Sequence, residues 1–149
     1  MGDTVPAPHP TDAGFTEAYS RAWTSDPEGL LAFFAEDGSY TDEAMGATYR
    51  GHDEILRFHR YMLRFAPDSV IAFSDTHAAD GRMYCEWVWS GTFGGPLKLR
   101  NGALVDATGR HFSSEGVSFC RYDATGRLTS HRDFWDLATL LHALDVPVG

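Results

Sequence analysis

Residues 34–42 read FAEDGSYTD, and residues 49–55 follow shortly after as YRGHDEI. An Asp-Pro pair at residues 26–27 is a helix-start signal, an N-cap followed by proline at the first helical position. The apolar run that follows predicts a short helix, which we expect to end at Gly38. Residues 39–42 then predict a brief strand. The stretch therefore indicates a helix, an acidic turn and a strand that ends in an aspartate.

Two further helices are indicated on either side of this stretch. The later one begins near Gly51, and Pro67 ends it. The earlier one is indicated by apolar residues at helical spacing, namely Phe15, Ala18, Tyr19, Ala22 and Trp23. Residues 1–10 contain three prolines and no apolar periodicity, which predicts a disordered leader. Residues 11–149 are then expected to form one domain.

Downstream of Pro67 the hydrophobic period changes from helical to alternating, which predicts strands. The expected strands span 69–78, 82–93, 97–105, 111–122 and 128–135, and a terminal helix spans 136–144. The pentapeptide DATGR occurs at 106–110 and 123–127, each between expected strands, and its glycine suits a hairpin turn with a positive φ. Helices followed by antiparallel strands predict an α+β protein with a curved sheet folded around the N-terminal helices.

Composition excludes several classes of function. The chain of 149 residues carries 12 Lys+Arg against 21 Asp+Glu, a formal net charge of −9, so nucleic acid is not an expected partner. No apolar run is long enough to span a membrane and no signal peptide is visible, so we expect a cytoplasmic protein. Two cysteines are too few for a disulfide scaffold, and seven histidines form no HxH or HExxH pattern, so no metal is expected.

Several motifs resemble a known family. The two stretches quoted above are similar to the NTF2-like superfamily in their short helix, acidic turn, strand ending in Asp and Gly-led helix. Four further motifs resemble its SnoaL-like polyketide cyclase branch: SGTFGG at 90–95, ATGR at 107–110, GVSFCR at 116–121 and HRDFWD at 131–136. The resemblance covers about residues 12–145.

The resemblance implies a fold and a function. It implies a cone-shaped α+β barrel with a deep pocket between the helices and the concave sheet, and a homodimer packed through the outer faces of the sheets. Family members commonly work without a metal or an organic cofactor. SnoaL-like cyclases close a ring of an aromatic polyketide by intramolecular aldol chemistry. We therefore expect a cofactor-independent cyclase of antibiotic-type biosynthesis that takes a hydrophobic, polyketide-like substrate.

Asp133 is the first candidate catalytic residue. By the period of two, His131, Asp133 and Trp135 share one face of the last strand, and Asp133 matches the acid/base aspartate that SnoaL-like cyclases carry there. Burial in a dry pocket would raise the pKa of such a carboxyl, which suits a group that takes a proton from carbon and returns one to oxygen. His131 would orient Asp133 or shuttle its proton.

Asp42 is the second candidate, because it matches the general base of the ketosteroid isomerase branch. If Asp42 and Asp133 both face the cavity, they would divide the roles of base and acid, and repulsion would separate their titrations. Ser118 stands where the isomerase branch has its oxyanion aspartate and would donate to a developing enolate. The oxyanion tyrosine of that branch falls at Ala18, one position from Tyr19, which argues against true ketosteroid isomerisation.

The remaining candidates are expected to form the wall of the pocket. A planar polycyclic substrate would stack on aromatic rings, and 13% of the chain is aromatic. The expected substrate-binding residues are Tyr19, Trp23, Phe33, Met83, Cys85, Trp87, Ser118 and Trp135.

Two groups of alternatives remain open. The same pocket would suit epoxide opening with ether-ring formation or hydrolysis, double-bond isomerisation, or cofactor-free hydroxylation. Two or three pocket carboxylates would favour epoxide chemistry over an aldol cyclase. The fold also suits a non-catalytic ligand-binding module, and a pocket plugged by Trp87 and Trp135 would favour that function.

Overall fold

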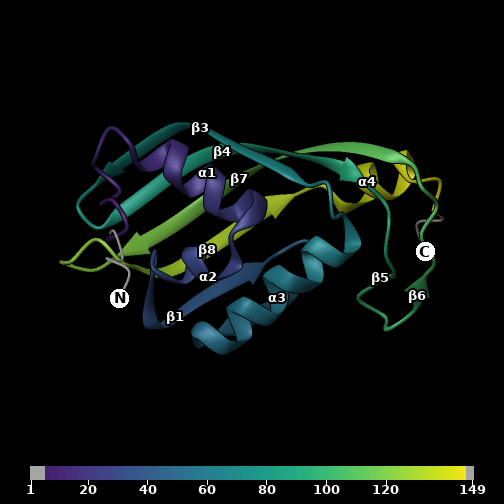
Figure 1. Cartoon of the computed structure of the whole chain (residues 1–149), viewed down its shortest axis with the longest axis horizontal. Coiled ribbons are helices and arrows are strands. Elements are labelled where there is room, and N and C mark those ends of the chain that lie inside the picture. The colour runs from purple at the N-terminus through teal and green to yellow at the C-terminus, as the bar shows by residue number, and fades with distance from the viewer. Residues whose placement is uncertain (1–5, 147–149) are drawn as a thin grey trace.

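Three helices lie across one face of a curved six-stranded sheet (Figure 1). The computed structural model describes residues 6–146. The helices are α1 (Phe15–Ser25), α2 (Pro27–Leu31), α3 (Gly51–Phe65) and the C-terminal α4 (Leu137–Ala143). The strands are β1 (Phe34–Asp42), β2 (Ala47–Arg50), β3 (Val70–Ala79), β4 (Arg82–Thr92), β5 (Leu97–Lys98), β6 (Leu104–Val105), β7 (His111–Tyr122) and β8 (Leu128–Trp135).

The large sheet has the strand order β2-β1-β8-β7-β4-β3. Only β1 and β8 run parallel, and the other neighbours are antiparallel. Because β2 and β3 stand at opposite edges and do not pair, the sheet is not closed, and it curves around the helices as the predicted cone-shaped fold requires. The architecture is the predicted α+β class, with helices in the concavity of a mostly antiparallel sheet.

Two predicted elements differ from the structure. The second helix ends at Leu31 instead of Gly38, because the backbone from Phe34 onward joins the sheet beside β8, with a register shift between Phe34 and Ser39. The segment 97–105 is a separate hairpin of β5 and β6 instead of one strand, since Gly102 turns the chain with a φ of +87°.

The repeated pentapeptide has two different roles. At 123–127 it forms the predicted hairpin turn between β7 and β8, and Gly126 has a φ of +87°. At 106–110 it connects β6 to β7, which lie in different sheets, so this copy is not a hairpin. Its glycine, Gly109, nevertheless has the predicted positive φ, at +73°.

The N-terminal segment of the described chain packs on the fold. The predicted leader covers residues 1–10, of which residues 1–5 lie outside the described residues. Pro10 is buried, and the His9 ring packs edge-on against Tyr122 with 5.2 Å between centroids. His9 and Pro10 therefore pack on the folded part of the chain, within the segment 1–10 that was expected to be disordered.

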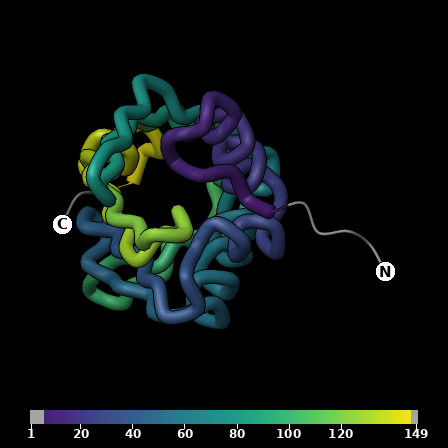
Figure 2. Tube along the Cα trace, turned by 90° about the vertical axis from the view of Figure 1, so that its left-hand side faces the viewer, coloured from purple at the N-terminus to yellow at the C-terminus, as the bar shows by residue number. Residues whose placement is uncertain are grey.

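The core divides into two clusters along the length of the molecule. One fills the space between the sheet and helices α1 to α3, and the other joins the C-terminal end of α3 to α4 and the ends of β4 and β7. Trp89 and Trp135 pack against both clusters. An end-on view shows the chain surrounding this central region (Figure 2). Within residues 6–146, no helix combines the length and the hydropathy that a membrane crossing requires.

Candidate active site

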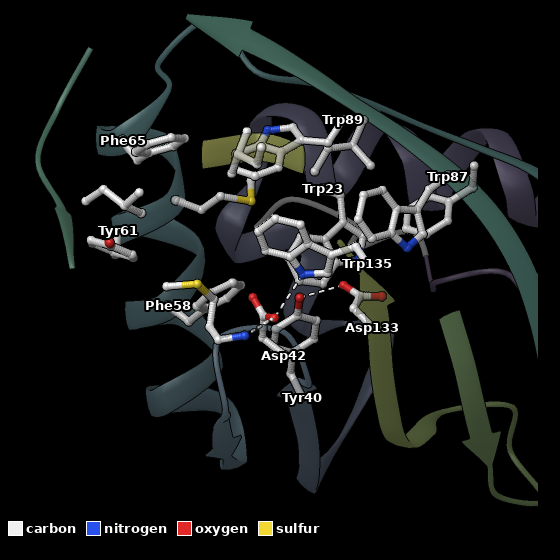
Figure 3. Close-up of a pocket in the computed structure, with 16 residues that line it drawn as sticks. Trp23, Tyr40, Asp42, Phe58, Tyr61, Phe65, Trp87, Trp89, Asp133 and Trp135 are labelled. Atoms are coloured by element: carbon white, nitrogen blue, oxygen red, sulfur yellow. Dashed lines mark hydrogen bonds between the residues drawn. The ribbon is translucent and has the colours of Figure 1, made fainter. Parts of the chain in front are cut away.

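A cavity lies between α3, the concave face of the sheet and α4, at the junction of the two core clusters (Figure 3). Its volume is about 70 Å³, and Trp87 and Trp135 are among the side chains that line it. Small-molecule sites typically hold ~300–1,000 Å³, so the surrounding side chains leave a narrow cavity in this structure. The lining residues are Trp23, Tyr40, Asp42, Met45, Phe58, Tyr61, Met62, Phe65, Ile71, Phe73, Trp87, Trp89, Leu97, Asp133, Trp135 and Leu140.

Asp133 projects from β8 into the cavity wall and is held by three side chains. The Tyr40 hydroxyl donates to Oδ2 at 2.5 Å, and His131 Nε2 lies 2.6 Å from Oδ1. The Ser118 hydroxyl donates to the same Oδ1. Because a carboxylate only accepts hydrogen bonds, His131 Nε2 carries a proton and donates it toward Asp133. Both oxygens of Asp133 are therefore already occupied by donors.

His131 connects this carboxyl to the first helix. The ring is fully buried, and the Tyr19 hydroxyl on α1 lies 2.6 Å from Nδ1. The Tyr19 hydroxyl meets the nitrogen opposite the one that faces Asp133, so both ring nitrogens have partners. The chain Tyr19–His131–Asp133–Tyr40 crosses the core from α1 through β8 to β1, which fixes the orientation of Asp133.

The electrostatic surroundings of Asp133 differ from the expectation. Burial by itself raises the pKa of this carboxyl, as we predicted. The facing His131 and the hydrogen bonds from His131, Ser118 and Tyr40 outweigh burial, and the pKa lies below its ordinary value. The predicted raised pKa of Asp133 was therefore wrong, because its three partners are invisible to an argument from burial alone.

Asp42 is the carboxyl with the raised pKa. It is buried at the end of β1, and burial raises its pKa to about 6, while the charge of Asp133 acts in the same direction. The backbone N–H of Met45 at 3.0 Å and the Trp135 Nε1–H at 2.9 Å both donate to Oδ1 and partly offset the rise. Within residues 6–146, Oδ2 accepts no hydrogen bond of ordinary geometry.

The predicted site residues fall into two sets. Five of them line the cavity: Trp23, Asp42, Trp87, Asp133 and Trp135. The others are buried but lie outside the lining: Tyr19, Phe33, Met83, Cys85, Ser118 and His131. Tyr19, Ser118 and His131 act on the cavity only through their contact with Asp133 or with each other, and Phe33, Met83 and Cys85 belong to the core.

Sequence reasoning missed Tyr40, whose hydroxyl lies between the two carboxyls (Figure 3). The signal was available, because Tyr40 and Asp42 are two positions apart on one strand and so share a face. Trp89 was missed as well, since the expected pocket face of that strand was read only as far as Trp87.

The described residues provide neither a metal-binding cluster nor a reactive thiol. In residues 6–146 no three His, Cys, Asp or Glu side chains are grouped so as to hold a metal ion. Cys85 and Cys120 are buried free thiols, and burial raises the pKa of Cys85 to about 12. A thiol with such a pKa is a poor nucleophile at neutral pH.

Comparison with known families identifies the class of protein. The model of the SnoaL-like domain matches residues 15–131. Because this match spans most of the chain and agrees with the fold described above, the protein belongs to the SnoaL-like family. A comparison of the sequence with curated proteins found no match.

Solved structures agree in fold. A protein with a ketosteroid isomerase-like fold from Catenulispora acidiphila is 23% identical with a TM-score of 0.75, over 92% of this chain and 96% of that one. A candidate SnoaL-like polyketide cyclase from Jannaschia is 12% identical with a TM-score of 0.76, over 99% and 100%. IdmH, a candidate polyketide cyclase from Streptomyces antibioticus, is 23% identical with a TM-score of 0.70, over 87% and 95%. At these identities the likeness shows the fold alone.

Proposed function

We propose that this protein is a cofactor-independent acid/base catalyst that closes a ring in a polyketide-type substrate by an intramolecular aldol reaction. The observation that carries the proposal is a pair of carboxyls in one apolar cavity, Asp42 and Asp133, whose pKa values are shifted in opposite directions. Such a pair separates the group that exchanges a proton from the group that stays charged. Membership of the SnoaL-like family and the candidate cyclases among its fold neighbours support the substrate class.

Asp42 is the proposed proton carrier. A pKa of about 6 makes it mostly ionised at neutral pH, yet a stronger base than an ordinary carboxylate. Its Oδ2 removes a proton from a carbon beside a substrate carbonyl, and the resulting carbanion attacks a second carbonyl carbon to form the new C–C bond. The alkoxide oxygen then takes the proton back from the Asp42 carboxylic acid.

Asp133 is proposed to remain ionised during this cycle. Its donors Tyr40, Ser118 and His131 stabilise the charged form, so it is a weak base. Its negative charge instead helps to raise the pKa of Asp42, and so tunes the base. This proposal exchanges the roles expected from the sequence, where Asp133 was the first candidate for proton transfer.

The test measures proton abstraction from carbon with 2-tetralone, a ketone with acidic protons beside its carbonyl. In D₂O the wild-type protein should accelerate exchange of these protons, followed by NMR. Asp42→Asn should lose most of that rate, by about 100-fold or more, the range of general acid–base catalysis. Asp133→Asn should keep activity. In the wild type the exchange rate should rise as the pH passes 6, where Asp42 ionises, and in Asp133→Asn this rise should occur at lower pH.

The matched control is Glu115→Gln, the same chemical change at an exposed position of β7. It should exchange 2-tetralone at the wild-type rate. Unchanged exchange in Asp42→Asn would remove Asp42 from the mechanism. Loss of exchange in Asp133→Asn alone would instead restore Asp133 as the base.

Epoxide opening is the second candidate function, and the presence of two cavity carboxyls favours it. Protonated Asp42 would give its proton to the epoxide oxygen, while a substrate hydroxyl or water attacks carbon and passes its proton to ionised Asp133. Epoxide opening does not require removal of a proton from carbon. A protein that opens 1,2-epoxytetralin but fails to exchange 2-tetralone would therefore fit the second candidate and contradict the first.

We further propose a homodimer packed through the outer faces of the sheets. Large apolar side chains are exposed on four neighbouring strands, on the side facing away from the helices. They are Val70 (53% exposed), Tyr84 (51%), Val117 (49%), Val88 (40%) and Phe134 (39%). Contiguous exposed apolar groups of this kind mark interaction surfaces.

A further inference from the structure

The charged residues that line the cavity are all negative. Two of its lining residues are ionised at neutral pH, and both are aspartates, Asp42 and Asp133. None of the lining residues among the described chain is lysine, arginine or histidine. The basic side chain His131 lies behind Asp133 and bonds to it. A ligand in the cavity therefore meets negative charge.

The two carboxyls differ in whether their charge is already compensated. Asp133 receives hydrogen bonds from three donors on both oxygens. Asp42 receives two, both on Oδ1, and Oδ2 accepts none of ordinary geometry from residues 6–146. The charge of Asp42 therefore has fewer partners in the protein than the charge of Asp133. A cation in the cavity would neutralise the charge of Asp42, whereas a neutral donor would only hydrogen-bond to it.

The rest of the wall is largely aromatic, and the rings stand at steep angles to one another. Trp89 and Trp135 are nearly perpendicular, at 88° with 6.3 Å between centroids. Trp23 is tilted by 51° against Tyr40, at 5.2 Å. In Figure 3, Tyr40 and Trp135 lie beside the two carboxyls, and Trp23, Trp87 and Trp89 lie on one side of them. Ring faces around a central space attract ammonium groups, and tryptophan does so most strongly.

We propose that the cavity binds a small organic cation, a protonated or quaternary ammonium group, with Asp42 as its counter-ion and the tryptophan and tyrosine rings as its cage. The inference rests on the proposed function for the location of the substrate site, and it specifies that the substrate carries an amine. Binding itself needs no turnover, so the two proposals can fail separately.

The surroundings of Asp42 make the binding depend on pH. Asp133 on β8, Tyr40 on β1 and Tyr61 on α3 line the same cavity, and Tyr49 on β2 is close enough for Asp42 to raise its pKa. Burial raises the pKa of Tyr40 and of Tyr49 above the ordinary value of a phenol, so neither changes charge in the range of the experiment. The charge that changes at the cavity face is therefore that of Asp42, with His131 behind Asp133 as the remaining titratable neighbour.

Cationic side chains near Asp42 are turned away from the cavity. Arg132 lies on the opposite face of β8, where it bonds to Glu43 at 3.0 Å and stacks on Phe134. The guanidinium of Arg100 packs beside Gly46, in the turn that follows Asp42, and is outside the lining. Neither therefore lines the cavity beside Asp42, where a ligand cation would bind.

The experiment compares choline with its uncharged carbon isostere, 3,3-dimethyl-1-butanol, by calorimetric titration. At pH 7.5 the wild-type protein should bind choline about tenfold more tightly, the factor expected for a desolvated cation beside aromatic faces. Lowering the pH from 7.5 to 5 should protonate Asp42 and reduce choline affinity, with little effect on the isostere. Equal affinities for the two compounds at pH 7.5 would overturn the proposal.

Asp42→Asn isolates the charge, because asparagine keeps an oxygen that can accept from Met45 and Trp135. This variant should bind the two compounds equally and lose the pH dependence, while Glu115→Gln should behave as the wild type. A preference for choline that persists in Asp42→Asn would contradict the assignment of the counter-ion. If the variant does not fold, the pH series on the wild type still decides.

The outcomes separate the two proposals. Exchange of 2-tetralone without a preference for choline would leave the acid/base function intact and reject the cation site. A preference for choline without any 2-tetralone exchange would keep the cation site and reject proton abstraction from carbon.

Discussion

Asp42 and Asp133 are direct partners in the parallel pairing of β1 and β8. Like charges at opposed positions of neighbouring strands are unfavourable. The protein relieves the repulsion asymmetrically: three donors stabilise the charge on Asp133, and Asp42 retains its proton up to about pH 6. At the scale of single residues, the chemistry of the cavity therefore follows from which of two adjacent carboxyls received the hydrogen-bond donors.

A stability measurement tests the raised pKa of Asp42. Its folded pKa of about 6 exceeds the ordinary value of 3.8, so between these values the folded state binds more protons. The stability that comes with protonation is present below pH 4 and is lost as the pH rises through 6. Asp42→Asn has no such loss, so at pH 7.5 it should be more stable than the wild type by up to about 3 kcal/mol.

Urea unfolding at pH 4 and pH 7.5 checks this expectation. The gain of Asp42→Asn over the wild type should shrink to a small remainder at pH 4, which lies close to the unfolded pKa of 3.8 and well below the folded pKa of about 6. Glu115→Gln should show no pH-dependent gain. The same difference at both pH values would mean that the substitution acts through packing and that the pKa of Asp42 is ordinary.

At the scale of the elements, β7 shapes the cavity because residue 116 on this strand is a glycine without a side chain. Gly116 pairs with Trp87 on β4 and with Trp135 on β8, so it separates two of the cavity indoles. A Cβ at Gly116 would lie 2.2 Å from Cζ2 of Trp87. The indole of Trp87 can therefore lie flat against β7 only because residue 116 has no side chain.

Gly116→Ala should displace the Trp87 ring and disturb the cavity. Overpacking of a core typically costs about 1–3 kcal/mol, and we expect the free energy of unfolding to fall by that amount. The intrinsic fluorescence should change as the indole environment changes. Gly14→Ala is the control, since a Cβ there meets nothing within 4 Å. Equal stability of the two variants would refute the close packing of Trp87 on Gly116.

At the scale of the whole molecule, the sheet separates two environments. Its concave face carries the core and the cavity, and its convex face carries the exposed valines and aromatics of β3, β4, β7 and β8. The first face binds a ligand in our proposal, and the second binds another copy of the chain. Substitutions on the convex face should thus change association without changing the cavity.

Val117→Arg tests the dimer face. A charge at this exposed position of β7 should shift the protein from dimer to monomer in analytical ultracentrifugation at micromolar concentration, because burying an unpaired guanidinium is unfavourable. Leu104→Arg changes an exposed apolar residue outside the large sheet, in the β5–β6 hairpin, and should leave the mass unchanged. A wild-type protein that sediments as a monomer would reject the proposal directly.

Much of the architecture could be predicted from local patterns. The alternation of Met83, Cys85 and Trp87 set the inner face of β4, and that of His131 and Asp133 set the inner face of β8. The boundary between α2 and β1 could not be predicted in the same way. Phe34 continues the apolar run of the helix, and only its pairing with Leu128, far along the chain, draws it into the sheet.

By itself, the sequence determined the α+β class, the resemblance to the SnoaL-like family and the positions of the two aspartates, because periodicity and motifs are local properties of the chain. Only the tertiary structure decided which of the two aspartates has a raised pKa and which has a lowered pKa. Tyr40, Ser118 and His131 come from three strands to meet Asp133, whereas Asp42 meets one indole and one backbone amide. A pKa depends on the groups within a few ångströms, and folding alone brings those groups together.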